Sequence, residues 1–329
     1  MSPKTLQGKI VASLLLGLAV ILVIGLVSDL REVAQDLRTF RWELLPTILG
    51  LTLLNYLLRG LKWDYYLRRL KCGAGVNAFT SGLIFTAGMV MAVTPGKLGE
   101  VFKSYLLRRV NGTAVSRSAS IVLAERLTDG LAMLLLMALG MTLYPPARIF
   151  FVTLLVATLV GIILVQNQTL STALIRLVAR MPIGARIAPR LETFYKTTQE
   201  LLDWRVLLIS TGISILSWGF ECPAFCVVLI GLGVEGSALL ALQATFIFAA
   251  TTLFGLVSFL PGGLGVSEVS SVGLLVTMVA MSAATATTAT LLIRFCTLWF
   301  GVLLGMIALA WFGRRYGSED MERVTPDTA

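Results

Sequence analysis

The stretch Thr94-Pro95-Gly96-Lys97-Leu98-Gly99-Glu100 interrupts a hydrophobic run in the first half of the chain, and Leu260-Pro261-Gly262-Gly263-Leu264-Gly265 interrupts another in the second half. Irregular backbone inside a bilayer has no water to satisfy its N–H and C=O groups. It is tolerated only where protein buries it or where it lines a water-filled cavity. Two such breaks in corresponding positions of two halves predict a transport-type site between inverted repeats.

The composition places most of the chain in a membrane. Of its 329 residues, 57% are hydrophobic and 14% are charged, which excludes an ordinary soluble domain and requires several spanning helices. Histidine is absent, which excludes histidine-based catalytic triads and histidine metal sites. We predict no catalytic residue, no metal site and no cofactor. The scattered cysteines, which we expect to be packing residues, are Cys72, Cys222, Cys226 and Cys296.

We predict an all-α polytopic membrane protein with about six full spans and two broken or re-entrant hairpins in an inverted-repeat arrangement. A single membrane domain covers residues 1–315, with repeat halves at about 44–166 and 204–312 and breaks at 94–100 and 260–266. The predicted full spans are 10–27, 44–58, 118–142, 149–165, 206–230 and 287–312.

The segments between these spans are predicted separately. Residues 29–43 form a mixed-charge linker, 167–205 a cytoplasmic basic connector with an amphipathic helix at 170–178, and 316–329 a polar cytoplasmic tail. The return arm of the first break, 98–110, reaches only roughly 20 Å, less than the ~30 Å hydrocarbon core, so this hairpin is predicted to be re-entrant. The return arm of the second break, 264–281, is long enough to span, and the sequence leaves open whether it dips or crosses.

Lysine and arginine are distributed unevenly between the two predicted faces. Nineteen flank the spans on one face, among them Arg59 and Lys62, which we place in a loop after residue 58. The positive-inside rule assigns this face to the cytoplasm, with both termini, in the plasma (inner) membrane. The same bias accounts for the net charge of +9 without a nucleic-acid partner. The four on the other face are Arg31, Arg38, Arg41 and Arg148.

Charged residues also occur inside the predicted spans. Glu125 and Asp129 share a helix face and Arg126 lies beside them. Isolated charges at this depth are costly, so they should face the bundle interior and pair. They form either a buried ion pair that fixes helix packing, or a polar lining for a headgroup or a proton-coupling site. Glu221 and Arg294 are each alone on a span, and either is a possible partner of the other.

The two breaks have similar surroundings. Each precedes an arm with a carboxylate, Glu100 or Glu268, and each is followed by a span with an arginine, Arg126 or Arg294. Lys97 lies at the tip of the first break, where helix N-termini would favour a phosphate or another anion. Lys103 lies on the return arm, where snorkelling to the inner surface is equally plausible. The predicted substrate-binding residues are therefore Pro95, Gly96, Lys97, Glu100, Lys103, Glu125, Arg126, Asp129, Glu221, Pro261, Gly262, Gly263, Glu268 and Arg294.

Three elements in this order resemble a known family. They are Pro-Gly-Lys-Leu-Gly-Glu at 95–100, Glu-Arg-Leu-x-Asp-Gly at 125–130 and Pro-Gly-Gly-Leu-Gly-Val-x-Glu at 261–268. They resemble the lysylphosphatidylglycerol synthase transmembrane region, also called the flippase-like or UPF0104 family, over roughly residues 10–312. In the full-length synthases this region is held to translocate aminoacylated phosphatidylglycerol across the bacterial membrane, while a separate soluble domain makes the lipid. The resemblance implies lipid translocation by a stand-alone membrane domain, not synthase activity.

We therefore expect a membrane lipid translocase, a flippase-like transporter or scramblase, that moves an anionic or lipid-linked headgroup through a polar site at the bilayer midplane. The expected partner is a membrane lipid, with a homo-oligomer or a lipid-synthesising enzyme as a possible further partner. Two other classes stay open. One is a non-transporting membrane partner of a lipid-modifying enzyme. The other is a membrane-embedded lipid transferase with Glu and Asp as acid and base, for which the sequence offers no nucleotide motif.

Overall fold

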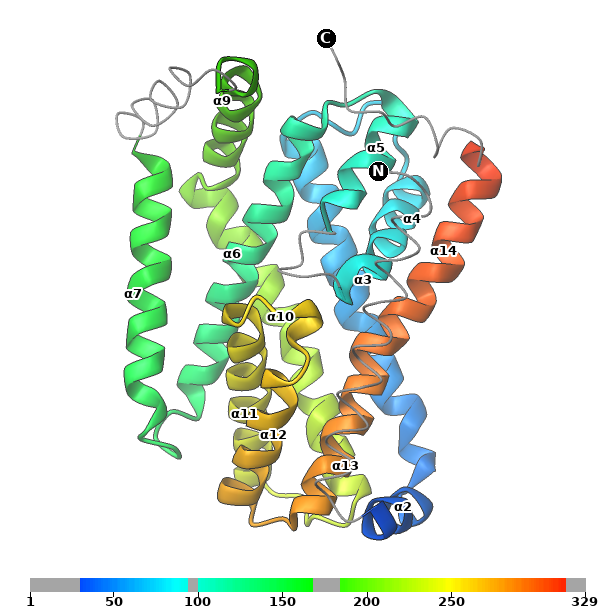
Figure 1. Ribbon diagram of the computed structural model, residues 1–329, viewed down its shortest axis with the longest axis vertical. Coiled ribbons are helices and arrows are strands. Elements are labelled where there is room, and N and C mark those ends of the chain that lie inside the picture. Colours follow the sequence, from blue (N-terminus) through cyan, green and yellow to red (C-terminus); the bar gives the residue numbers. More distant parts are fainter. Residues whose placement is uncertain (1–29, 94–99, 168–183, 318–329) are drawn as a thin grey trace.

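The structure is a computed structural model that describes residues 30–93, 100–167 and 184–317 (Figure 1). Every regular element within these ranges is a helix, in agreement with the predicted all-α fold. Four predicted features lie wholly or almost wholly outside the described residues. They are the first span at 10–27, the tip of the first break at 94–99, the amphipathic helix at 170–178 and the polar tail at 316–329.

The helices follow the order of the predicted repeat. Those of the first half and the connector are α2 (Leu30–Thr39), η1 (Trp42–Leu44), α3 (Leu45–Arg69), α4 (Ala78–Gly88), η2 (Met89–Val93), α5 (Phe102–Asn111), α6 (Val115–Leu139), α7 (Ala147–Gln166) and α9 (Gly184–Leu201). Those of the second half are α10 (Trp204–Gly231), α11 (Ala238–Val257), η4 (Pro261–Gly263), α12 (Val266–Leu274), η5 (Leu275–Val279), α13 (Ala283–Arg294), η6 (Phe295–Trp299) and α14 (Phe300–Tyr316).

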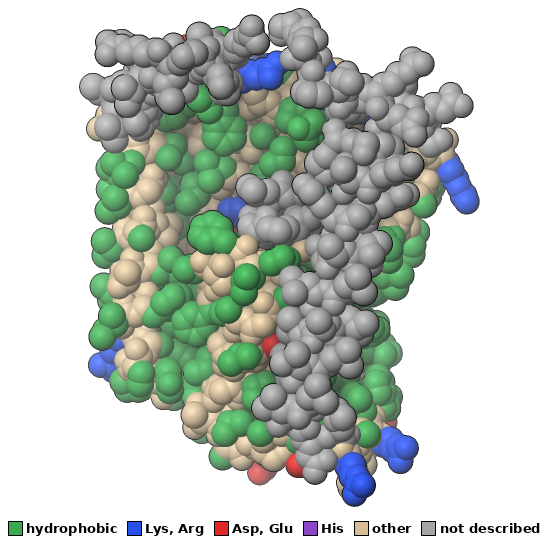
Figure 2. Space-filling model, viewed as in Figure 1, with side chains coloured by type: hydrophobic (Ala, Val, Ile, Leu, Met, Phe, Trp, Pro, Cys, Tyr) green, Lys and Arg blue, Asp and Glu red, His purple; other side chains and the backbone are tan. Residues whose placement is uncertain are grey.

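The outer surface of the bundle is apolar. Six helical segments of the described chain are long and hydrophobic enough to cross a membrane, two of them the arms of the second hairpin. On α7, for example, Ile149 is 81% exposed and Ile163 is 64% exposed. Figure 2 shows hydrophobic side chains along the flank and Lys and Arg mainly toward the two ends. The chain is therefore a multi-pass membrane protein, since water would not tolerate this surface.

The two hairpins enter the bundle from opposite ends. In Figure 1, α4 and α5 occupy the upper part, whereas α11 and α12 rise from the lower end and return to it. The second broken region therefore dips and does not cross. The next helices, α13 to α14, then run from the lower end to the upper end. The packing is also repeated, because α4 packs on α14 as α11 packs on α6, and α3 packs on α10 at the centre.

The inner ends of the two hairpins touch. Gly262 and Gly263 form the second tip with φ values of 59° and 70°, a conformation that glycine adopts without a Cβ clash. A Cβ added to Gly262 would lie 3.7 Å from the carbonyl oxygen of Ala92 and 3.7 Å from Cα of Val93, at the end of η2. The inverted hairpins therefore meet inside the bundle, as the repeat predicts.

Local sequence explains how the hairpin arms begin and how closely they pack. Asn77 caps α4 by accepting from the Thr80 N–H at 2.8 Å, and Ser237 caps α11 by accepting from the Leu240 N–H at 3.0 Å. On α14, a Cβ at Gly305 would lie 2.7 Å from the Val90 nitrogen of η2. The absence of a side chain at this glycine lets α14 approach the first hairpin closely.

Two predicted boundaries are wrong. The span predicted at 44–58 continues as α3 to Arg69, so Arg59 and Lys62 lie on a helix inside the bundle and not in a cytoplasmic loop. The predicted linker at 29–43 contains the ten-residue helix α2. In sequence, the charges of α3 resemble a cluster that flanks a span, although those at 59 and 62 share one helix face.

Candidate functional site

A cavity opens where the two hairpins meet. It encloses about 1160 Å³ of space, including its open mouth. Residues from both halves line it: Glu100 and Lys103 follow the first break, whereas Gly262 and Gly263 form the second. Polar, charged and aromatic side chains from α3 and α10 also line it. They are Asn55, Tyr56, Arg59, Trp218 and Glu221.

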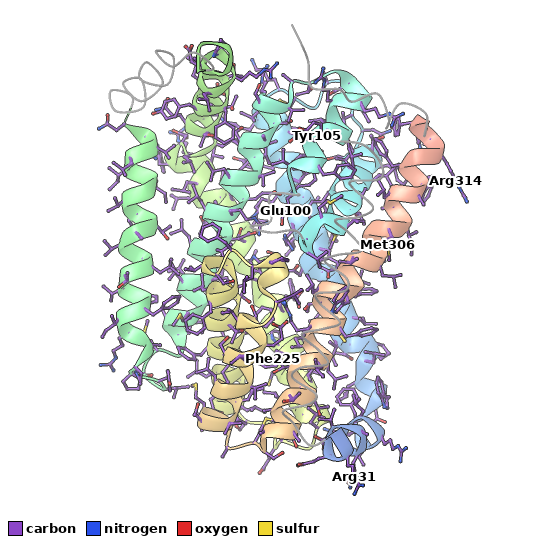
Figure 3. All side chains as sticks on the ribbon, in the orientation of Figure 1. Arg31, Glu100, Tyr105, Phe225, Met306 and Arg314 are labelled. Carbon is purple, nitrogen blue, oxygen red and sulfur yellow. The ribbon has the colours of Figure 1, made fainter. Side chains whose placement is uncertain are left out.

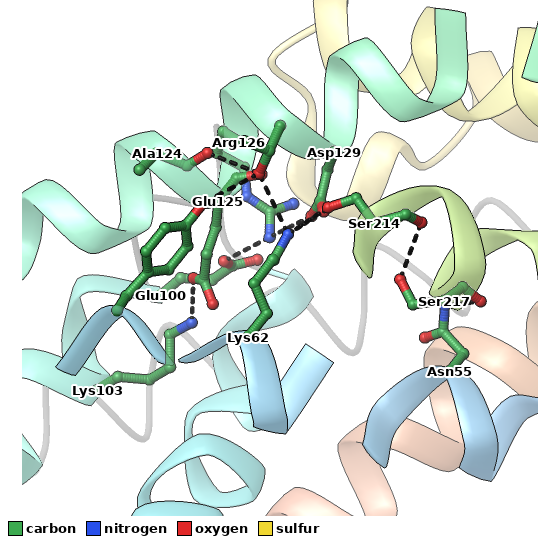
Figure 4. A network of polar contacts seen from close by, with 12 residues as sticks. Asn55, Lys62, Glu100, Lys103, Ala124, Glu125, Arg126, Asp129, Ser214 and Ser217 are labelled. Carbon is green, nitrogen blue, oxygen red and sulfur yellow. Dashed lines mark hydrogen bonds and ion pairs between the residues drawn. The ribbon is translucent and has the colours of Figure 1, made fainter. Parts of the chain in front are cut away.

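Beside the first break, Arg126 of α6 joins two carboxylates. Its guanidinium lies 3.0 Å from Glu100 and 3.3 Å from Asp129 (Figure 4). Glu100 comes directly after the break, so this contact attaches the return arm of the first hairpin to a long helix. Figure 3 shows Glu100 among the helices inside the bundle, far from Arg31 at the lower end.

Lys103 is buried in the same region. Its ammonium lies 2.5 Å from Glu125 and also 4.8 Å from the centroid of the Trp63 ring. A Cβ at Gly88 would lie 2.3 Å from the Lys103 side chain, so the glycine makes room for the lysine stem. The side chain is 4% exposed, which excludes snorkelling to the inner surface. Lys103 therefore belongs to the internal polar network.

A further buried cation, Lys62, holds the centre of the network. It donates to Asp129 at 2.5 Å, to Ser214 of α10 at 2.7 Å and to Thr128 at 3.3 Å (Figure 4). Ser214 in turn donates to Asp129 at 2.9 Å. Lys62 thus links α3, α6 and α10, and its side chain is only 1% exposed. Removing either partner would leave the other charge buried, so the pair constrains how the three helices pack.

The second break has an equivalent arrangement. Arg294 at the end of α13 donates to Glu268 at 2.6 Å and to the Gly262 carbonyl at 2.7 Å. Glu268 also accepts from the Gly265 N–H at 2.7 Å, which satisfies a free amide at the start of α12. The partner of Arg294 is therefore Glu268, and the pairing of Arg294 with Glu221 that the sequence left possible is wrong.

Arg59 and Glu221 differ from the other charged groups of this region. Within the described chain, neither forms an ion pair with an N···O distance of 4.0 Å or less. The Arg59 guanidinium lies 5.0 Å from the centroid of the Trp218 ring. Glu221 is 1% exposed and accepts one hydrogen bond from Thr52 at 3.3 Å. Both line the cavity, so it contains a cation and a carboxylate without counter-charges in contact.

Two further polar atoms of the cavity wall have no hydrogen-bond partner among the described residues. They are the amide oxygen of Asn55 and the indole nitrogen of Trp218. The Asn55 nitrogen is occupied because it donates to the Ser217 carbonyl at 2.9 Å. Buried polar atoms are normally paired, so an unpaired acceptor and an unpaired donor beside Arg59 indicate a place for a polar ligand.

The structure brings most predicted site residues together. Those that line the cavity are Glu100, Lys103, Glu221, Gly262, Gly263 and Arg294. Glu125, Arg126 and Asp129 lie behind them in the network, and Glu268 supports Arg294. Pro261 begins η4 at the second tip. Pro95, Gly96 and Lys97 lie outside the described residues.

Sequence reasoning missed Asn55, Arg59 and Lys62 as site residues. A signal was present, because positions 52, 55, 59, 62 and 66 carry polar or amphipathic side chains at alternating intervals of three and four. This spacing places them on one face of a helix. Of these, Thr52, Asn55, Lys62 and Tyr66 are almost completely buried.

The cavity is lined by the basic side chains of Arg59, Lys103 and Arg294 and by the carboxylates of Glu100 and Glu221. In the parts of the chain that the structure describes, no cluster of three or more Cys, Asp or Glu side chains is arranged to hold a metal ion. All four cysteines are buried and unpaired, as expected for packing residues. Arginine presents a planar set of donors that fits phosphate and carboxylate oxygens. Arg59, with the Trp218 N–H, is therefore suited to hold the anionic part of a ligand.

Comparison with known proteins gives matches over nearly the whole chain. The family described as the lysylphosphatidylglycerol synthase TM region matches residues 14–305. A UPF0104 membrane protein of Methanothermobacter thermautotrophicus is 26% identical over 328 residues, which cover 95% of this chain and 94% of the relative. A second UPF0104 membrane protein of the same organism is 23% identical over 289 residues, covering 80% of this chain and 84% of the relative.

Proposed function

This chain belongs to the lysylphosphatidylglycerol synthase TM region family, and we propose from this premise that it is a lipid translocase that moves an anionic or lipid-linked headgroup across the plasma membrane. Both described ends of the bundle are then aqueous, with the end that carries Arg314 in the cytoplasm. The basic loops at that end support this orientation through the positive-inside rule.

The proposal depends on one observation: a polar cavity lies at the contact between two hairpins that enter from opposite ends. The cavity combines Arg59, Lys103 and Arg294 with the glycine backbone of the second tip. In a bilayer, a charged headgroup avoids the cost of leaving water only if protein groups replace its hydration. A cavity of this kind supplies such groups to the headgroup while the acyl chains stay in lipid.

The charge network explains how cations are kept inside the bundle without a ligand. Lys103 is balanced by Glu125, and Arg294 by Glu268. These pairs fix the walls of the cavity, whereas Arg59 has a guanidinium that is stacked but not paired with a carboxylate in the described structure. An incoming anion would therefore not compete with a carboxylate for Arg59, as it would for Lys103 or Arg294.

Reconstitution into liposomes tests the proposal. The probes are an acyl-labelled anionic phospholipid and an acyl-labelled zwitterionic one, so that the headgroups are unmodified. We expect the wild-type protein to accelerate transfer of the anionic probe between leaflets more than that of the other probe. Glu125→Gln, Arg126→Ala and Lys97→Ala should slow this transfer when rates are compared at equal amounts of folded protein. The matched control is Lys196→Ala, which removes an exposed lysine paired with Glu192.

The outcome that would refute the proposal is equally direct. If protein-containing vesicles exchange neither probe faster than empty vesicles, translocation is refuted. If all three variants transfer lipid as fast as the wild type, the hairpin junction is not the path of the headgroup. The Lys196→Ala control shows whether slower transfer in a variant is only a general effect of removing a positive charge.

A further inference from the structure

Glu221 is exceptional among the carboxylates around the cavity. Glu100, Glu125, Asp129 and Glu268 each have a basic side chain within 3.0 Å. Glu221 is as deeply buried as these, yet its contact in the described structure is a hydroxyl, that of Thr52. A buried carboxylate without a cation is unfavourable as the charged form, because no water and no counter-charge replaces its hydration.

The ionisable groups around Glu221 come from three elements. Tyr56 and Arg59 lie on α3, Cys222 follows on α10, and Cys296 lies on η6, each at electrostatic range. Helix α11, which also packs against α10, carries no titratable side chain. Arg294 of α13 is already bound to Glu268. Arg59 is therefore the basic side chain that interacts electrostatically with Glu221.

The balance of charge couples these two residues. With Glu221 ionised, the described charges around the cavity cancel, since each other cation has a carboxylate partner. An anion that binds Arg59 would then add an uncompensated negative charge inside the bundle. With Glu221 protonated, the same anion restores neutrality. In a medium of low dielectric constant this difference favours binding of the anion and the proton together.

We propose that Glu221 is the binding site of a proton that is carried together with the anionic headgroup held by Arg59. The proposal rests on the translocase function and names the co-transported ion. The proton enters from water in the cavity, adds to the Glu221 carboxylate, and returns to water on the opposite side after the headgroup leaves. Because linkage is reciprocal, anion binding raises proton affinity by the factor by which the proton raises anion affinity.

Binding measurements on the purified full chain in detergent test this coupling. The probe is dihexanoyl phosphatidylglycerol, whose phosphodiester keeps its charge near neutral pH. We expect the wild-type protein to bind the probe more tightly as the pH falls through the titration range of Glu221, by up to about tenfold per pH unit. We also expect binding in weakly buffered solution to remove up to one proton per probe molecule from the medium.

Variants separate the roles of the two residues. Glu221→Gln mimics the protonated form, so it should bind the probe at all pH values as tightly as the wild type does at low pH, without proton uptake. Glu221→Asp keeps a titratable group and should keep the pH dependence. Arg59→Gln should lose tight binding. Glu192→Gln removes an exposed carboxylate and should behave as the wild type.

Each alternative result has a defined meaning. If the wild type binds the probe with the same affinity at every pH and takes up no proton, the proton proposal is overturned while translocation stands. If Glu221→Gln retains wild-type pH dependence, Glu221 is not the proton site. Should Glu221→Gln fail to fold, proton uptake by the wild type and by Glu221→Asp decides the matter. If the probe binds at no pH, the anion site at Arg59 and the proton coupling built on it are overturned, whereas translocation is decided by the lipid-transfer assay.

Discussion

Arg294 and Glu268 lie 2.6 Å apart, and this pair joins the end of α13 to the first turn of α12, the return arm of the second hairpin. Arg126 and Glu100 make the corresponding contact at 3.0 Å in the first half. The two hairpins are therefore attached by the same type of ion pair to the long helix that follows each of them. A rearrangement that moves either hairpin must therefore break its ion pair or move the paired helix with it.

The Arg294–Glu268 pair should show strong energetic coupling. Arg294→Gln and Glu268→Gln each remove one partner of a largely buried pair, and each should lower the stability of the protein by about 3–5 kcal/mol. The double variant should lose less than the sum, with a coupling energy of roughly 0.5–3 kcal/mol. Thermal unfolding in detergent measures these values. Strictly additive effects would show that the contact does not hold the second hairpin.

Lys62 should be essential for packing although it touches no predicted ligand. Lys62→Met leaves Arg126, 3.3 Å away and shared with Glu100, as the basic side chain at Asp129 in the described structure, and should destabilise the protein by about 3–5 kcal/mol. The double variant with Asp129→Asn should recover part of this loss, because it removes the stranded charge. Lys196→Met provides the control, since its exposed pair with Glu192 should contribute under about 1 kcal/mol. Equal effects of the two lysine substitutions would contradict this assignment.

The close approach of α14 to the first hairpin can be tested at Gly305. An alanine there would place its Cβ 2.7 Å from the Val90 nitrogen, a backbone atom that cannot move alone. Gly305→Ala should therefore lower the free energy of unfolding by about 1–3 kcal/mol. Gly313→Ala on the same helix meets nothing within 4 Å and should be neutral or slightly stabilising. Thermal unfolding of both variants in one detergent gives the comparison.

The dip of the second hairpin predicts which loops share a side. Ser237 before α11 and Ser282 before α13 are exposed at the same end of the bundle, whereas Ala74 and Ala114 are exposed at the other. Cysteines placed singly at these positions should react with a membrane-impermeant thiol reagent in two groups, the first from outside and the second from the cytoplasm. The native cysteines give a low background because all are buried. Labelling of positions 237 and 282 from opposite sides would contradict a re-entrant hairpin.

Much of the fold follows from the sequence because the bilayer restricts what an apolar chain can do. The spans, the break at 260–266 and the inverted order of the halves are visible as hydrophobic runs and proline–glycine interruptions. The pairing of charges was less predictable. Arg294 selects Glu268 rather than Glu221 because the return of α12 brings Glu268 alongside α13, a tertiary relationship that no sequence spacing records.

The largest error concerned α3. Arg59 and Lys62 resemble the cationic cluster that normally marks the end of a span, and Arg68, Arg69 and Lys71 do form such a cluster. Helix phase distinguishes Arg59 and Lys62 from that cluster, because they continue the polar face that begins at Thr52. Burial of that face requires counter-charges and hydrogen-bond partners from α6 and α10, and these become visible only when the helices are assembled.

The central claim is that the cavity at the hairpin junction carries an anionic headgroup, and lipid transfer by Arg59→Gln tests it most directly. Arg59 stacks on Trp218 inside the cavity, whereas Arg205 makes a similar contact with the exposed Trp204 at the start of α10, so Arg205→Gln is the matched control. In proteoliposomes with an acyl-labelled anionic phospholipid, Arg59→Gln should slow transfer by at least about tenfold, because a hydrogen bond to a charged group contributes roughly 1.5–3 kcal/mol. Arg205→Gln should retain the wild-type rate. Transfer by Arg59→Gln at the wild-type rate, with equal amounts of folded protein, would contradict the account.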